Sequence, residues 1–554
     1  MVAIIIKFFL IVAINIEWYC VAIDDVGILL HAEKNLKPNG VRGRLTFHGI
    51  KYTIKALTKA LLPQLQNTTM KSSPLNTTIG NASIMIEKIR LLTASEPKHV
   101  DVNQHQLDTV IVSMRNFTIS IESNLRAENI SEAFVNGRCT IRSEQTRLNV
   151  IVRVQKGTNG SPLINVHECR VNTTAPYVIA CGELLPVNMS SFVQESLLKE
   201  APHLVGTSLC DHARWIIKSK INERLMQMPS SISLAEITRA NMLSHRKSLR
   251  NYNSSIRGRA RRAPESLIAL IDSFNLSRAS NLLLDYGMLT DPITSPYGVE
   301  FNSSGEVSID GKGGTPFGSV PVELPPALKN STAMLHMVIS DFVPNSLMHH
   351  GHKIGLFNTR VDPSTPQLGP VMRTTCGFTS GPLFCLGDLL PTLRHFHPNR
   401  GIAMIFSSAQ PPAIIFRSGN QGAFFAMNGH IAVWAIDDRG VEKRVGEMAI
   451  EIEALAKFRM VGTILKSKLS LEKIHLKSLN SIALQQDELD DAGLLGREIM
   501  QKIVNDALKD GVPIPIHPIF RLLKTKVAVI DRACILVTDF RLNNEIIKEL
   551  ANRR

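Results

Sequence analysis

Long segments in which apolar and polar residues alternate constrain this chain more than any other feature of its sequence. From Leu148 to Val154, every second residue is a leucine or a valine. Residues 83–92, SIMIEKIRLL, and residues 116–125, NFTISIESNL, show similar alternation. Successive side chains of a strand point to opposite faces of its sheet, so these segments predict half-buried strands of antiparallel sheets.

Helical patterns frame these strands. Residues 49–66 place apolar residues on one helix face and Lys51, Lys55 and Lys59 on a second stripe. Further helices are predicted, in chain order, at 190–227, 331–350 and 491–511. Further strands are predicted between 401 and 484 and, as a single closing strand, at 526–540. The chain thus repeats one plan of strands and helices in two halves, separated by a Ser-, Asn- and Arg-rich segment that indicates an exposed linker.

The first 22 residues have the composition of a secretory signal peptide. One early cation, Lys7, precedes the apolar run FFLIVAINI, and Cys20 and Ala22 stand at positions −3 and −1 of a cleavage site. The alternative is a membrane anchor, which the short apolar core and Glu17 disfavour. The protein is therefore expected to be secreted and extracellular.

Twelve Asn-x-Ser/Thr sequons agree with this location, because a chain in the secretory route can carry glycans at them. All of them lie before residue 331. The predicted glycosylation sites are Asn67, Asn76, Asn81, Asn116, Asn129, Asn159, Asn172, Asn188, Asn253, Asn275, Asn302 and Asn330.

The charge of the chain indicates its class of partner, and the cysteine count indicates its disulfides. Lys and Arg exceed Asp and Glu by 7 in residues 24–230 and by 7 in residues 231–262, whereas residues 263–554 are neutral in sum. A basic secreted domain suggests anionic partners such as lipid headgroups, lipopolysaccharide or glycosaminoglycan; the alternative is that the charge only aids solubility. Without Cys20, seven cysteines remain, which predicts mostly disulfides and one thiol left over.

Four features, in the right order along the chain, resemble the family of bactericidal/permeability-increasing protein, lipopolysaccharide-binding protein and cholesteryl ester transfer protein. Residues 41–57, VRGRLTFHGIKYTIKAL, are similar to its opening strand and first helix. Cys169 and Cys210 match its shared disulfide in spacing and context. Residues 282–307, LLLDYGMLTDPITSPYGVEFNSSGEV, resemble its central segment, and residues 504–518, VNDALKDGVPIPIHP, its late signature. The long basic linker and five further cysteines depart from the family pattern.

The resemblance implies an α+β fold, an elongated boomerang of two barrels, each a highly twisted antiparallel sheet with two helices, joined by a central antiparallel sheet. The implied divisions are a signal peptide at 1–22, an N-terminal lipid-binding barrel at 23–230, a basic linker at 231–262, a central-sheet region at 263–330 and a C-terminal lipid-binding barrel at 331–554, which includes its share of the central sheet.

The resemblance also implies a disulfide between Cys169 and Cys210. Two further pairs come from the residues themselves. Cys376 and Cys385 would close a short loop, and Cys139 with Cys181 follows by elimination, which leaves Cys534 as the odd thiol.

The function implied is that of a secreted protein holding phospholipid or another acyl-chain lipid in apolar pockets, with lipid transfer or lipopolysaccharide recognition in innate immunity as more specific roles. The alternative is a secreted protein-binding scaffold with no lipid cargo. The candidate lipid contacts, which core packing alone would also explain, are Ile50, Ile54, Leu57, Leu61, Leu197, Ile217, Ile221, Leu495, Ile499 and Ile503.

An enzyme is the rival class. The sequence contains no Gly-x-Ser-x-Gly motif, no Gly-rich phosphate loop and no HExxH motif, so no catalytic residue is predicted. His349, His350 and His352, like His395 and His397, lack cysteine or carboxylate partners at ligand spacing. No metal, other cofactor or nucleic acid is predicted as a partner.

The linker carries Arg259, Arg261 and Arg262 in an Arg-x-Arg-Arg sequence. This pattern predicts either cleavage by a secretory convertase or an uncleaved basic linker. The uneven charge further predicts that the first barrel and the linker dock on anionic membranes, whereas the neutral second barrel does not.

Overall fold

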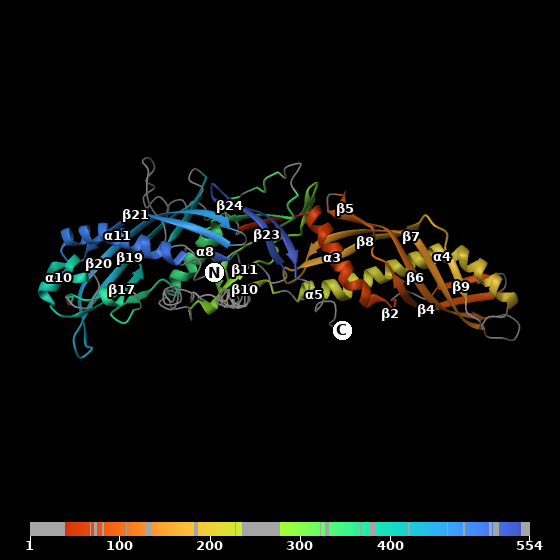
Figure 1. Ribbon diagram of the computed structural model, residues 1–554, viewed down its shortest axis with the longest axis horizontal. Helices are drawn as coiled ribbons and strands as arrows, with labels where there is room; N and C mark the ends of the chain where they lie inside the picture. Colours follow the sequence, from red (N-terminus) through yellow and green to blue (C-terminus); the bar gives the residue numbers. More distant parts are fainter. Residues whose placement is uncertain are drawn as a thin grey trace, which may run out of the picture.

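The computed structural model is elongated, with one large sheet at each end and another sheet between them (Figure 1). It describes residues 39–543 apart from several gaps. The gaps are 67, 71–74, 80–81, 107, 129–134, 182–186, 228, 235–277, 322, 327–331, 366–367, 377–383, 419–421, 462–463, 480–481, 509–511 and 514–519. The predicted signal peptide and the Arg-x-Arg-Arg sequence lie outside the described residues.

The N-terminal half is an antiparallel sheet covered on one face by helices. Its strands are β2 (Thr68–Thr69), β3 (Leu75–Ile79), β4 (Ala82–Ala94), β5 (His99–Gln106), β6 (Thr109–Glu128), β7 (Val135–Lys156), β8 (Pro162–Thr173) and β9 (Val178–Cys181). Its helices are α3 (Phe47–Leu65), α4 (Val187–Ile216), the π-helical turn η1 (Ile217–Asn222) and α5 (Glu223–Met226). Thr46 begins α3, because its hydroxyl accepts a hydrogen bond from the Gly49 amide at 3.2 Å.

The C-terminal half repeats this plan. Its strands are β16 (Thr359–Val361), β17 (Gly401–Ser408), β18 (Ala413–Arg417), β19 (Gly422–Ile436), β20 (Glu442–Val461), β21 (Ile464–Ser478) and β22 (Val512–Pro513). Its helices are α8 (Phe342–Lys353), α9 (Leu386–Leu389), α10 (Pro391–Phe396) and α11 (Gln486–Leu508). A small sheet of β10 (Ser231–Ser233), β11 (Leu282–Asp285) and β14 (Val307–Ile309) packs into the core of this half.

The central sheet interleaves the two halves. Its order is β12 (Ile293–Ser295), β13 (Gly298–Ser303), β1 (Val41–Thr46), β15 (Leu335–Ser340), β24 (Ala533–Leu542) and β23 (Phe520–Ile530), with all pairs antiparallel. Gly43 lies opposite Phe301, whose ring fills the space that a Cβ of residue 43 would need. Buried Arg44 is held by Glu300 at 2.8 Å and by the Pro325 carbonyl at 2.8 Å.

Three sequence predictions about local structure need correction. Residues 335–340 form strand β15 instead of helix, because LHMVIS pairs between β1 and β24 and its alternate side chains are buried. Residues 526–540 belong to two strands, since Asp531 and Arg532 turn the chain, Arg532 with a φ of 65°. Residues 231–233, expected in the linker, pair with β11. The predicted α+β class with antiparallel sheets around a central sheet is confirmed.

In both halves, an asparagine side chain hydrogen-bonds the backbone of the last long strand in the same way. In the first half, the buried carboxamide of Asn222 accepts from the Ile164 amide at 2.9 Å and donates to the Ile164 carbonyl at 2.8 Å, along β8. In the second half, Asn505 makes the same pair of bonds with Leu469 of β21, at 2.9 and 3.0 Å. Each helix thereby satisfies backbone groups that an edge strand would leave unpaired. No described helix has the length and apolarity needed to cross a bilayer.

Candidate functional site

Helix α3 packs in two directions, so its predicted single apolar face is divided. Ile50 and Ile54 contact a cluster formed mainly by Val102, Val110 and Val112 of the N-terminal sheet, which Val299 of β13 completes. Leu57 instead contacts the central sheet, in a cluster with Tyr52, Phe540 and Leu542. Leu61, like these three, is half-buried. The helix is therefore shared by the first half and the central sheet.

Helix α4 forms the main core of the first half with β4, β6 and β7. Leu197 is 0% exposed and lies within this core beside Leu204 and Ile121. Leu197 therefore belongs to the core of the first half, and its contact with lipid stays a prediction. Ile217 and Ile221 lie in the π-helical turn η1 beside β8 and are half-buried.

The two helical units lie over one face of the sheet and leave a seam between them. Register places Val110, Val152 and Val166 in one row across β6, β7 and β8. On the β5–β6 side this face contacts α3, and on the β7–β8 side it contacts α4 and η1. Val152 and Met114 pack against both clusters, which places them at the seam.

Side chains at the seam keep part of their surface open. Met114, Val152 and Val166 are half-buried, whereas Val110 and Val150 on either side are buried. A core filled by side chains would bury the middle of the sheet most completely. The seam is thus a place in the described first half where apolar side chains near the middle of the sheet keep part of their surface exposed. Sequence reasoning treated these residues only as strand positions, although the alternation from Leu148 to Val154 marked their face.

In the second half, α8 and α11 cover the seven-stranded sheet. Met500 of α11 packs against the core around Leu347, Ala454 and Leu471. Leu495 is 52% exposed, whereas Leu489 of the same helix is buried in the core, so the contact of Leu495 with lipid stays a prediction. Ile499 and Ile503 belong to α11, but their side chains lie outside the described part of the structure.

The cysteines pair as the sequence predicted. Cys139 is bonded to Cys181, Cys169 to Cys210 and Cys376 to Cys385, and Cys534 is free. Cys169–Cys210 ties β8 to α4 in the first half. Burial raises the pKa of the Cys534 thiol to about 12, so it is uncharged at neutral pH.

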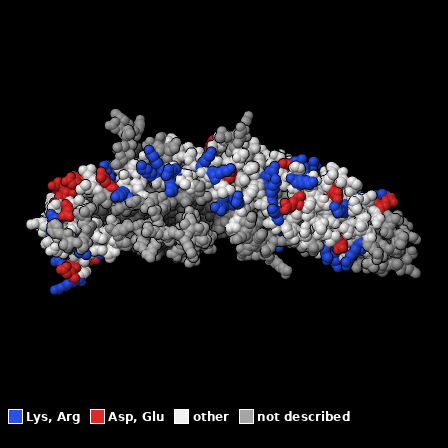
Figure 2. Space-filling model, viewed as in Figure 1, with Lys and Arg blue, Asp and Glu red and all other residues white. Residues whose placement is uncertain are grey.

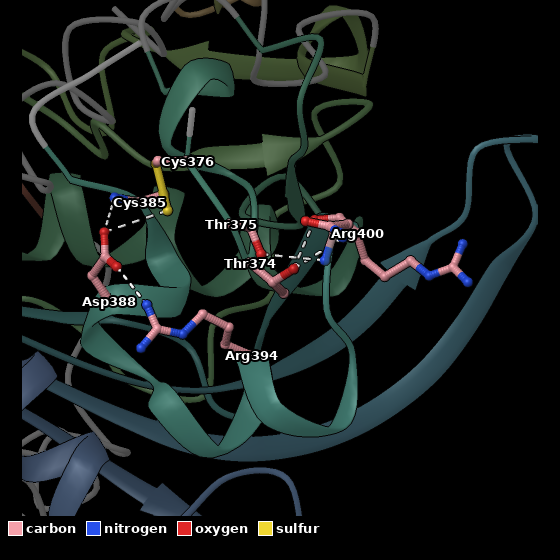
Figure 3. The surroundings of a disulfide bond; sticks show 8 residues. Thr374, Thr375, Cys376, Cys385, Asp388, Arg394 and Arg400 are labelled. Carbon is pink, nitrogen blue, oxygen red and sulfur yellow. Dashed lines mark hydrogen bonds and ion pairs between the residues drawn. A yellow bond between two sulfur atoms is a disulfide. The ribbon is translucent and has the colours of Figure 1, made fainter. Parts of the chain in front are cut away.

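Among the described residues, one group has the spacing of metal ligands: Cys376, Cys385 and Asp388. Figure 3 shows the two sulfurs joined to each other, while Asp388 accepts from the Cys385 amide at 2.9 Å and from Arg394 at 2.8 Å. Because both sulfurs are used in the disulfide, this group has a structural role at the N-terminus of α9.

The predicted histidine cluster lies on α8 and does not converge on one point. His352 Nδ1 lies 2.7 Å from the Ser408 hydroxyl, and His350 Nε2 lies 3.7 Å from a Glu306 carboxylate oxygen. Burial, aided by nearby Lys353, lowers the pKa of His349 to about 4, which keeps its ring neutral at neutral pH. His397 lies at the end of α10, where burial lowers its pKa, and the adjacent His395 is exposed on that helix.

The sequons differ in accessibility. Asn116 and Asn172 are exposed on β6 and β8. The Asn159 amide donates to the Met226 carbonyl at 2.6 Å, and Asn302 is half-buried and accepts from Thr290. Asn76 lies in β3 and Asn188 in α4, with side chains that the structure does not describe. The sequons outside the described residues are Asn67, Asn81, Asn129, Asn253, Asn275 and Asn330.

Comparison with known proteins finds a family model for the C-terminal half of the chain and a solved structure that aligns with most of it. A model of the "LBP / BPI / CETP family, C-terminal domain" matches residues 276–542. The crystal structure of lipopolysaccharide binding protein aligns with 91% of this chain and 99% of its own, at 12% identity and a TM-score of 0.50, which supports the fold. No curated protein sequence matches significantly.

Two other solved structures align less well. Takeout 1 of Epiphyas postvittana covers 32% of this chain and 93% of its own, at 10% identity and a TM-score of 0.25. P47 of Clostridium botulinum E1 covers 92% of this chain and 100% of its own, at 8% identity and a TM-score of 0.26.

Proposed function

Since residues 276–542 carry the C-terminal domain of the LBP / BPI / CETP family, which confirms the resemblance noted in the sequence, we propose that this protein is a secreted lipid-binding protein. Its ligand is a phospholipid or another acyl-chain lipid, and each half holds one. The observation that carries the proposal is the seam at Met114, Val152 and Val166, where apolar side chains between two helical units stay half-buried.

In such an apolar site, the binding free energy comes from the acyl chains of a lipid more than from its headgroup. Each methylene moved from water into an apolar environment contributes about 0.8 kcal/mol, so two acyl chains bind without any charged contact. The described seam offers only aliphatic and thioether side chains, which suit lipid tails of many kinds. The headgroup then remains near solvent and adds little discrimination.

The first structural neighbour and the basic charge of residues 24–262 suggest more specific roles. The printed name of the first structural neighbour refers to lipopolysaccharide, an anionic lipid, and the excess of Lys and Arg in residues 24–262 suits an anionic lipid surface. We therefore propose lipid transfer or lipopolysaccharide recognition outside the cell, with the first half as the docking end. A protein-binding scaffold without lipid is the competing function.

Lipid content of the secreted protein tests the proposal. Solvent extraction followed by mass spectrometry is expected to yield acyl-chain lipid in stoichiometric amount. The variant Val152→Trp places an indole in the seam and is expected to lower the lipid content of the first half. Val178→Trp adds the same bulk on exposed β9, where Val178 is 57% exposed, and is expected to leave the lipid content unchanged. Absence of lipid from correctly folded wild-type protein would favour the scaffold.

A further inference from the structure

The inner ends of β20 and β21 carry four cations in two facing pairs. Lys457 lies directly opposite Lys468, and Arg459 lies directly opposite Lys466. Residues directly opposite each other in an antiparallel pair point to the same face. These two rows therefore place all four cations on one face of the sheet, opposite the face that buries Ala454, Ala456 and Leu469 in the core.

Among the residues that the structure describes, no acidic side chain pairs with these cations. The sequence has no Asp or Glu between Glu453 and Glu472. Lys457, Arg459 and Lys468 are exposed, Lys466 is half-buried, and none of the four forms an ion pair with any residue that the structure describes. Figure 2 shows Lys and Arg side chains gathered where the C-terminal sheet meets the central sheet, with Asp and Glu concentrated at the outer end instead.

The repulsion between these facing cations destabilises the sheet, and no ion pair among the described residues offsets it. Like charges directly opposite each other in a sheet are destabilising, and here two such pairs stand side by side. Lys473 on the same strand shows the usual solution, because it pairs with Glu451 at 3.0 Å. An uncompensated cluster is explained most simply by an anionic partner that neutralises it.

An apolar side chain lies beside the cations. Val461 at the end of β20 is 48% exposed and, two residues beyond Arg459, points to the same face as the cations. A sulfated polysaccharide would gain nothing from Val461, whereas a bilayer accepts apolar side chains below its headgroups. The combination of exposed cations and an exposed apolar side chain favours a membrane over a polysaccharide.

We propose that the inner ends of β20 and β21 dock on an anionic phospholipid bilayer, with the four cations among the headgroups and Val461 at the acyl boundary. Residues 263–554 are neutral in sum, so their total charge predicts no docking. The segregation of that charge gives the second half its own contact with the membrane. The proposal concerns an outer surface and does not depend on lipid held in the seam of the first half.

Vesicle binding by the full chain tests the proposal. Partitioning is measured on phosphatidylcholine vesicles with and without phosphatidylserine at low ionic strength. Lys457→Gln/Lys468→Gln is expected to weaken partitioning onto the anionic vesicles by about thirty-fold, since each cation near such a surface is worth about five-fold. The same variant relieves a repulsive pair, so its thermal stability is expected to equal or exceed that of the wild type.

A matched control removes the same charge elsewhere on the sheet. Lys443→Gln/Lys477→Gln changes two exposed lysines near the opposite ends of β20 and β21 and is expected to leave partitioning nearly unchanged. Val461→Ser, which changes no charge, is expected to weaken vesicle binding but not binding to immobilised heparin. Equal losses in both lysine pairs would reduce the effect to net charge and overturn the proposal. It is also overturned if Lys457→Gln/Lys468→Gln loses heparin binding but still binds vesicles as the wild type does. Lipid extraction from the same samples separates failure of this proposal from failure of the lipid-carrying function.

Discussion

Replacement of Asn222 by alanine is expected to destabilise the first half by about 2 kcal/mol. Asn222 is 5% exposed, and its carboxamide bonds both backbone groups of Ile164 at 2.8 and 2.9 Å. The alanine variant loses two hydrogen bonds, each worth about 1 kcal/mol net. It also leaves the amide and carbonyl of Ile164 without their partner.

Two smaller terms adjust this value. Alanine favours helix over asparagine by roughly 0.5 kcal/mol, which offsets part of the loss. Ile164 is half-buried, so water reaches its backbone only in part, and the unpaired groups add a penalty toward the low end of about 1–3 kcal/mol. Together the two terms leave a loss of about 2–2.5 kcal/mol and a fall in Tm of about 4–10 °C for a unit of this size.

Chemical denaturation and hydrogen exchange measure the effect. The Ile164 amide is expected to exchange faster in Asn222→Ala, while amides of the C-terminal sheet keep their protection. Asn505→Ala is the counterpart in the second half, and the Leu469 amide is its reporter. The two losses are expected to add, because distant sites act independently. A loss below about 0.5 kcal/mol, the range of ordinary surface substitutions, would refute the idea that these side-chain amides stabilise the edge strands through their paired hydrogen bonds.

Three further predictions concern covalent links and titration. Removal of Cys169–Cys210 by a double serine variant is expected to cost about 3–4 kcal/mol in denaturant unfolding, and peptide mapping that pairs Cys169 elsewhere would contradict the assigned bridge. Because the pKa of His349 is lowered from 6.5 to about 4, the folded protein binds that proton less readily than the unfolded chain. Stability is therefore expected to fall as the pH drops from 6.5 to 4, and His349→Gln should flatten this slope in thermal unfolding at stepped pH. Cleavage after Arg262, absent in Arg262→Ala, is expected to give two bands on a non-reducing denaturing gel, because each disulfide lies within one half, but a single species in native size-exclusion chromatography.

Local pattern predicted the elements better than it predicted their partners. The alternation around Val150 and the helical spacing from Ile50 identified a strand and a helix correctly. Spacing could not reveal that Ile50 and Leu57 face different sheets, because the central sheet forms from strands far apart in the chain. For the same reason, the six residues of β15 were predicted as part of the helix that follows them.

The candidate site shows the same division. Resemblance to a family indicated that helix faces would contact lipid, yet Leu197 is fully buried and Leu495 is exposed. Half-burial depends on how closely two helices approach over a sheet, and no single segment encodes that distance. Met114 and Val152 could therefore be recognised only once the packing of α3 and α4 was known.

The place of β1 in the central sheet also sets an order for biosynthesis. Val41 of β1 pairs with Ser303 of β13 and with Ile339 of β15, so both neighbours are synthesised roughly 300 residues later. At about 5–20 residues per second, β1 waits roughly 15–60 s for its partners while the large N-terminal sheet can already fold. During that interval both edges of β1 are open to other chains. A nascent chain stalled before Gly298 would hold a folded sheet next to a strand with both edges unpaired, and one stalled before Leu335 would still leave one edge of β1 open.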